Sequence, residues 1–163
     1  MNKAFNDNRG KTSDDYNTSK SAFALLKEFV PEDQILYDPF FNDGTSKKYM
    51  EEVFKCTVIH ENRDAFEWMP ECDLIITNPP FSKKYKVLDW LIKQEKPFFC
   101  LLPLYTIATK KFGDIDGFDK LQFIVGNGRI KYEKGDDKIG CASFESAWFC
   151  HKIDLPRDIT FVI

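Results

Sequence analysis

Long apolar segments are absent from this chain of 163 residues. No run of apolar residues approaches the ~20 that a membrane-spanning helix requires, and residues 1–20 are polar, without the apolar core of a secretory signal. We therefore expect a protein that makes no contact with a membrane. We place it in a reducing compartment inside the cell, cytoplasmic or, in a eukaryote, nuclear.

Cysteine is scarce and irregularly spaced. The odd number of cysteines, and the lack of close Cys–Cys or Cys–His spacing apart from the adjacent Cys150 and His151, argue against a disulfide framework and a zinc site. We predict no bound metal and expect buried, unreactive thiols, because free cysteine usually behaves as a small hydrophobic residue. The five cysteines are Cys56, Cys72, Cys100, Cys141 and Cys150.

Internal repeats, low-complexity tracts and linkers rich in Gly, Ser or Pro are also absent. Hydrophobic residues make up 43% of the chain and include 16 Phe, a globular composition with enough apolar side chains for one core. We expect a flexible polar N-terminus over residues 1–15 and a single domain over residues 16–163. The net charge of −3 does not by itself indicate nucleic-acid binding, although local clusters of Lys and Arg can hide within such a total.

Strand-like and helix-like stretches alternate along the chain. This alternation favours a doubly wound α/β domain, in which a mostly parallel sheet carries helices on both faces and ends in a C-terminal antiparallel hairpin. The expected helices cover residues 19–30, 47–54 and 82–94. The expected strands cover residues 34–40, 56–62, 72–81 and 97–104, followed by the antiparallel pair 122–133 and 142–153.

Unusual polar residues stand where the predicted strands end. Asp38, Glu61 and Asn78 each follow an apolar strand directly. In parallel α/β sheets, ligands bind at the carboxyl ends of the strands. The three residues therefore mark the expected site.

The segment Asn78-Pro79-Pro80-Phe81 is suited to a poor nucleophile such as the exocyclic amino group of adenine. This nitrogen delocalises its lone pair into the ring and attacks a methyl group badly. Hydrogen bonds accepted by the Asn78 side-chain oxygen and the Pro79 carbonyl would localise that pair and stabilise the positive charge that develops. The alternative interpretation is a Pro-rich turn that only ends a strand.

The remaining residues of the segment suit a base taken out of its stack. The two prolines fix φ and keep the preceding carbonyls in an extended arrangement. Phe81 offers a flat face for base stacking, which is worth about 1–3 kcal/mol per base. Because an adenine inside a duplex cannot reach such a site, base flipping or a single-stranded target is implied.

With this motif the sequence resembles the amino-methyltransferase family, whose members carry Asn/Asp-Pro-Pro followed by Tyr, Phe or Trp on a Rossmann-like sheet. The resemblance covers roughly residues 12–150, and Asn with a final Phe is similar to N6-adenine methyltransferases of DNA or structured RNA. It implies S-adenosylmethionine as cofactor and methyl transfer to N6 of adenine in a nucleic acid. DNA is favoured slightly over RNA, because the compact chain resembles phage and viral DNA enzymes.

The resemblance also implies a cofactor side. Residues 38–46 resemble the family's acidic-Pro-x-x-Gly-x-Gly loop, where Asn42 replaces the first glycine and can still adopt positive φ. Asp38 would address the ammonium group of the cofactor and Glu61 its ribose hydroxyls, with Asp64 beside the adenine. Their short spacing leaves open which acid holds the ribose, and a solvated acidic turn is the alternative. The implied residues are Tyr16, Thr18, Asp38, Pro39, Phe40, Asn42, Gly44, Glu61, Asp64 and Phe66.

Tyr16 and Thr18 belong to a Tyr-x-Thr-Pro-like element that folds over the methionine part of the cofactor in this family, with Ser19 in place of proline. Ordinary N-cap chemistry for the next helix is the other reading of these residues.

Basic residues follow the motif and the fourth expected strand. At the rim of a pocket they would contact phosphates, although each pair alone is more often a solvated face. The expected nucleic-acid residues are Ser82, Lys83, Lys84, Lys110, Lys111 and Arg129. No separate target-recognition domain is evident, so target readout would come from a partner subunit, from a second copy in a homodimer, or from RNA shape.

Two other functions remain open at this point. Related release-factor enzymes methylate a protein glutamine amide and also use Asn-Pro-Pro with an aromatic residue, though they favour Tyr. The chain could also be a non-catalytic, cofactor-binding subunit of a methyltransferase complex. Intact Asn78 and Phe81 argue against that alternative.

Overall fold

The computed structural model describes residues 16–134, 138–142 and 144–163. The segment predicted to be a flexible N-terminus, residues 1–15, lies outside the described residues. The division of the chain into this segment and one domain therefore stays a prediction.

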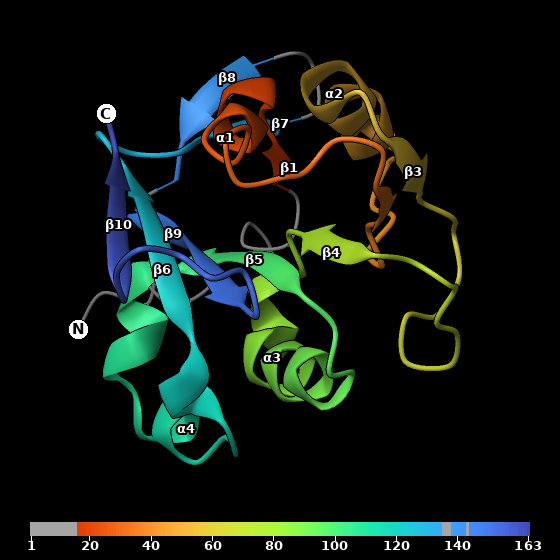
Figure 1. Ribbon diagram of the computed structural model, residues 1–163. Coiled ribbons are helices and arrows are strands. Elements are labelled where there is room, and N and C mark those ends of the chain that lie inside the picture. The colour runs from red at the N-terminus through yellow and green to blue at the C-terminus, as the bar shows by residue number, and fades with distance from the viewer. Residues whose placement is uncertain (1–15, 135–137, 143) are drawn as a thin grey trace, which may run out of the picture.

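A seven-stranded sheet forms the centre of the molecule (Figure 1). Its strand order is β10-β6-β9-β5-β4-β2-β3, and all neighbouring pairs are parallel except those that β9 makes with β5 and β6. The strands are β2 (Ile35–Tyr37), β3 (Thr57–Ile59), β4 (Leu74–Thr77), β5 (Phe98–Pro103), β6 (Gln122–Gly126), β9 (Ser146–His151) and β10 (Ile159–Val162). The mostly parallel sheet with a late antiparallel pair is the predicted fold class.

Helices cover both faces of this sheet, as predicted. In Figure 1, α1 and α2 lie on one side and α3 and α4 on the other. The α-helices are α1 (Lys20–Ala24), α2 (Thr45–Phe54), α3 (Lys84–Lys93) and α4 (Lys110–Gly113), and the 3-10 helices are η2 (Phe81–Lys83), η3 (Leu104–Ala108) and η4 (Phe118–Lys120). In the described part of the chain, no helix combines the length and apolarity needed to cross a bilayer.

A second, three-stranded antiparallel sheet has the order β1-β7-β8 and was not predicted. Its strands are β1 (Asn17–Thr18), β7 (Lys131–Lys134) and β8 (Lys138–Cys141). The predicted strand 122–133 is therefore divided: β6 pairs with β9, and the chain then turns through Gly128, at φ +97°, into β7. Glycine adopts this left-handed conformation without the cost of a side chain.

Two further boundaries differ from the sequence-based prediction. The first helix ends at Ala24 rather than at residue 30, because the next turns close through i→i−3 bonds such as Leu26 N to Phe23 O. Strand β10 was not predicted and lies at the edge of the sheet beside β6. Between β3 and β4 the described chain contains no helix or strand.

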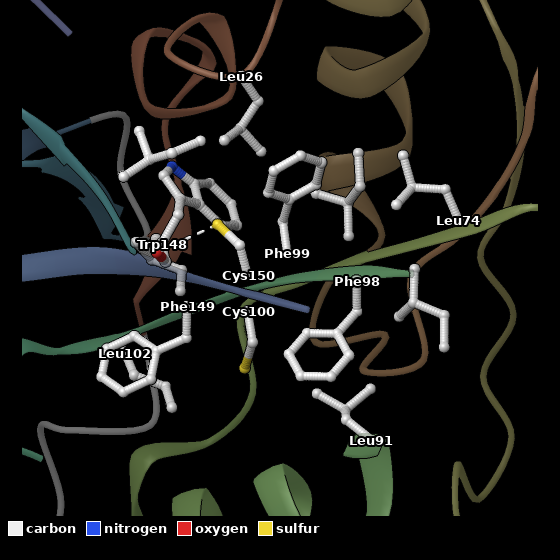
Figure 2. Close-up of a cluster of buried hydrophobic side chains, with 14 of the residues drawn as sticks. Leu26, Leu74, Leu91, Phe98, Phe99, Cys100, Leu102, Trp148, Phe149 and Cys150 are labelled. Atoms are coloured by element: carbon white, nitrogen blue, oxygen red, sulfur yellow. Dashed lines mark hydrogen bonds between the residues drawn. The ribbon is translucent and has the colours of Figure 1, made fainter. Parts of the chain in front are cut away.

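Strands β5 and β9 form the centre of the core. Every residue in both is buried, and Figure 2 shows their side chains alternating between the two faces of the sheet. Trp148 points toward Leu26 on the α1 side, whereas Phe98 points toward Leu91 of α3 (Figure 2). The Trp148 indole N–H donates to the Ala22 carbonyl at 3.1 Å, so its polar atom is satisfied inside the core.

The described cysteine side chains are free and buried, as predicted. Burial raises the pKa of the Cys72, Cys100 and Cys150 thiols, which disfavours the reactive thiolate. The side chain of Cys141 lies outside the described residues.

Candidate functional site

A pocket of about 250 Å³ opens at the carboxyl ends of β2, β3 and β4. These ends meet because the three strands are parallel neighbours in the sheet. The lining residues are Tyr16, Pro39, Phe40, Phe41, Asn42, Asn62, Arg63, Asn78, Pro79, Pro80 and Phe81. The structure thus brings the Asn-Pro-Pro-Phe motif, part of the 38–46 loop and Tyr16 to one place.

Asn78 sits in the pocket wall with one half of its amide occupied. Its Nδ2 donates to the Tyr16 carbonyl at 3.0 Å. Its Oδ1 is buried and has no hydrogen-bond partner among the described residues. Because the bond to Tyr16 requires the NH₂ group on that side, it fixes which way the amide faces.

Phe81 lines the same pocket but is only 4% exposed. Tyr132 of β7 and Phe144 pack edge-on against its ring, at centroid distances of 6.3 and 5.4 Å. Tyr16 in turn lies 5.4 Å from Tyr132. The small sheet and the segment after it therefore hold the aromatic residue of the motif in place, and little of its surface is open for stacking in this conformation.

The loop between β2 and α2 is tightly turned. Asn42 adopts φ +48° and Gly44 φ +84°, so the asparagine that replaces glycine takes the left-handed conformation that the sequence suggested. A Cβ on Gly44 would lie 2.9 Å from Cζ of Phe41. Asp43 accepts a hydrogen bond from the Thr45 N–H at 2.9 Å, which caps the start of α2.

Asp38 lies behind the pocket wall and not in it. The residue is 3% exposed, and its carboxylate accepts bonds from Thr77 Oγ1 at 2.7 Å, Ser46 Oγ at 2.8 Å and the Phe40 N–H at 3.4 Å. Burial raises the pKa of this carboxyl, and His60 together with these donors opposes the shift. Its position therefore differs from the predicted contact with a cofactor ammonium group: it ties the loop to β4 and α2.

The acidic residues after β3 also lie outside the lining. Glu61 is exposed and forms an ion pair with Arg63 at 2.8 Å. Asp64 is exposed and accepts a bond from the Phe66 N–H at 2.9 Å. The Phe66 ring stands 6.1 Å from Phe40, one layer behind the wall.

The residues of this segment that do line the pocket are Asn62 and Arg63, which the sequence analysis did not select. Their only sequence signal is their place directly after a strand. Thr18 is buried in β1, and Gly44 is the N-cap of α2, so neither lines the pocket.

No protein-family model and no curated protein matches the chain. Among solved structures, a protein from Listeria monocytogenes described as a candidate class I S-adenosylmethionine-dependent methyltransferase matches 94% of this chain and 67% of its own, with 14% identity and a TM-score of 0.52. At this identity the likeness shows a shared fold. The chain has the class I methyltransferase fold.

Weaker likenesses go to two RNA methyltransferase structures. The 23S rRNA methyltransferase ErmE has 10% identity and a TM-score of 0.47, over 83% of this chain and 68% of its own. A candidate RNA methyltransferase from Pyrococcus horikoshii has 12% identity and a TM-score of 0.46, over 84% of this chain and 83% of its own.

On this methyltransferase fold, a surface of aromatic and basic residues adjoins the motif. We call Lys84, Tyr85, Tyr105 and Lys111 the Tyr105 surface. Lys84 Nζ donates to the Phe81 carbonyl at 3.3 Å and lies 4.7 and 5.7 Å from the Tyr85 and Tyr105 ring centroids. Lys111 Nζ lies 5.7 Å from the Tyr85 ring, and Tyr105 is 51% exposed. Two predicted lysines are thus brought together with two tyrosines that the sequence analysis did not select.

The other predicted nucleic-acid residues are not gathered on this surface. Lys110 is exposed and pairs with Asp114 at 2.9 Å. Arg129 pairs with Glu145 at 3.0 Å and lines a separate hollow of about 190 Å³. Ser82 and Lys83 are exposed in η2, directly after the motif.

Proposed function

We propose that this chain transfers a methyl group from S-adenosylmethionine to the N6 amino group of an adenine in nucleic acid, with DNA preferred over RNA. The observation that carries the proposal is the Oδ1 atom of Asn78. It is a buried acceptor without a partner among the described residues, in the wall of a pocket that also contains Pro79 and Phe81.

A buried acceptor without a hydrogen bond costs about 1–3 kcal/mol, so such an atom is kept where a ligand supplies the donor. The adenine amino group has two N–H donors. We assign one to Asn78 Oδ1 and the other to the Pro79 carbonyl. The pair would hold the nitrogen close to tetrahedral, localise its lone pair and stabilise its positive charge as the methyl group arrives.

The residues in the pocket fit the cofactor. Phe40 provides an aromatic wall for an adenine ring, and Gly44 keeps the Phe41 side of the loop free of a Cβ. We assign the carboxylate of the cofactor to Arg63 and its ribose hydroxyls to the amide of Asn62, because Glu61 points its charge at Arg63 outside the lining. When bound, the cofactor supplies an electrophilic methyl group on sulfur.

The Tyr105 surface fits the strand that carries the target base. Lysine ammonium groups neutralise phosphates, and an exposed tyrosine can stack a neighbouring base. Lys84 is bonded to the Phe81 carbonyl, so a phosphate on it would lie next to the motif. This arrangement requires an adenine that is flipped out or single-stranded.

The test is transfer of labelled methyl groups to duplex DNA, single-stranded DNA, ribosomal RNA and transfer RNA, followed by digestion to nucleosides and mass spectrometry. We expect N6-methyladenine, with more label on DNA. Asn78→Ala should lower kcat by about 100-fold or more, while calorimetric affinity for the cofactor stays within a few fold. Asn127→Ala, the same change at an exposed site, is the matched control.

Other results would redirect the proposal. Label on a protein amide and none on nucleic acid would indicate a glutamine methyltransferase. Cofactor binding without transfer to any substrate would indicate a subunit that supports a catalytic partner.

A further inference from the structure

His60 follows β3 directly, and its side chain is fully buried beneath the 38–46 loop. Nδ1 lies 3.0 Å from the Asp38 carbonyl oxygen, and Nε2 lies 3.1 Å from the Phe41 carbonyl oxygen. The Phe41 ring stacks on the imidazole at a centroid distance of 4.9 Å and an angle of 25°. One side chain thus spans both ends of the turn that forms the pocket wall.

The partners of this ring determine its protonation. A carbonyl oxygen can only accept a hydrogen bond, so each ring nitrogen must donate, and a neutral imidazole has only one N–H. Ser46 Oγ, 3.2 Å from Nε2, does not relieve the conflict, because its own proton goes to Asp38 Oδ2 at 2.8 Å. Either neutral form would therefore point a nitrogen lone pair at a carbonyl lone pair.

The charges around the ring favour the doubly protonated form. Asp38 Oδ2 lies 3.4 Å from Nδ1, so an imidazolium and a carboxylate would compensate each other inside the protein. The nearest other charged groups are occupied elsewhere: Glu61 pairs with Arg63, and Lys47 of α2 bonds to the Val58 carbonyl.

We propose that His60 is a buried imidazolium that positions the cofactor loop by donating to both of its carbonyls. As far as cofactor binding is concerned, this rests on the proposed function. The folded loop binds the protonated ring, so the stabilisation is present at low pH and is lost as pH rises and the proton leaves. Cofactor affinity should fall in parallel.

The direct test is ¹⁵N NMR of the ring nitrogens from about pH 5 to pH 9, without cofactor. The chain has two histidines, and His151→Gln assigns the signals. Burial lowers the pKa of His151, so its ring serves as the neutral reference. We expect both His60 nitrogens to carry protons at neutral pH, and the Phe41 ring signals to shift at the same midpoint. A single neutral tautomer of His60 at pH 6, or Phe41 signals that ignore its titration, would overturn the proposal.

Calorimetric titration with S-adenosylmethionine over the same pH range tests the functional consequence. Affinity of the unsubstituted protein should fall about tenfold across the His60 midpoint, as expected for loss of one charge-assisted bond. His60→Gln should bind weakly and without this pH dependence, and His151→Gln should retain it. A pH-independent affinity in the unsubstituted protein would refute the positioning role, whereas failure to bind the cofactor at any pH would refute the proposed function and leave the NMR result to decide His60.

Discussion

The polar residues of this site differ in whether protein partners already occupy their atoms. Both Asp38 oxygens accept bonds from protein donors, and the residue is enclosed. Asn78 has an occupied Nδ2 and an unoccupied Oδ1. Saturated groups stabilise the fold, whereas an acceptor left open is suited to a ligand. This distinction assigns a structural role to Asp38 and a binding role to Asn78.

Tyr105 should contribute to nucleic-acid binding and not to chemistry. Base stacking is worth about 1–3 kcal/mol, so we expect Tyr105→Ala to raise KM for nucleic acid by about 5- to 100-fold with kcat within a few fold. Tyr105→Phe keeps the ring and should restore binding. Phe118→Ala removes another exposed ring, in η4, and should leave KM unchanged. An equal loss in both alanine variants would contradict a specific role for Tyr105.

Several elements meet at the cofactor loop. Thr77 at the end of β4, Ser46 in α2 and His60 after β3 all contact Asp38, which follows β2. A loop held from so many elements is rigid only if each of them is correctly placed, so damage to the loop should affect both stability and binding.

Gly44→Ala should distort this loop. The new Cβ would lie 2.9 Å from Phe41 at a φ of +84°, so we expect a loss of about 1–3 kcal/mol in the free energy of unfolding and weaker cofactor binding. Urea denaturation and calorimetry measure the two effects.

Gly113→Ala is the matched control for this change. No heavy atom lies within 4 Å of the added Cβ, and the residue is in α4. We expect a neutral or slightly stabilising effect of at most about 1 kcal/mol. If the two variants lose equal stability, the strain argued for Gly44 is wrong.

At the scale of the whole molecule, stability depends on the layer between the sheet and α3. Phe98 is fully buried there and points toward Leu91 (Figure 2). Phe98→Ala should therefore cost about 3–5 kcal/mol of unfolding free energy. Phe161→Ala makes the same change in β10, where the ring is 71% exposed, and should cost at most about 0.5 kcal/mol. Similar urea midpoints for the two variants would contradict this description of the core.

Local patterns in the sequence were sufficient for the architecture. Apolar runs at β2, β4 and β5 predicted the central strands, and the segment 82–94 predicted α3, because burial of a strand or a helix face leaves its period in the sequence. The polar residues at strand ends predicted where a site would form, since parallel strands present their carboxyl ends together.

Other features depended on contacts between distant segments. The partners of β6, β7 and β10 are chosen by the packing of the sheets, so residues 122–133 could not be divided from sequence alone. Tyr105 joins Lys84 across the end of β5 for the same reason.

By itself, then, the sequence determined the fold class, the strand ends that carry the site and the Asn78-Pro79-Pro80-Phe81 segment. Only the tertiary structure decided which polar atoms are saturated: Asp38 is closed in by its neighbours, while Asn62 and Arg63 reach the pocket wall. The physical reason is that a residue's type and spacing fix its chemistry and local conformation, whereas hydrogen-bond partners and burial depend on segments that are distant in the chain.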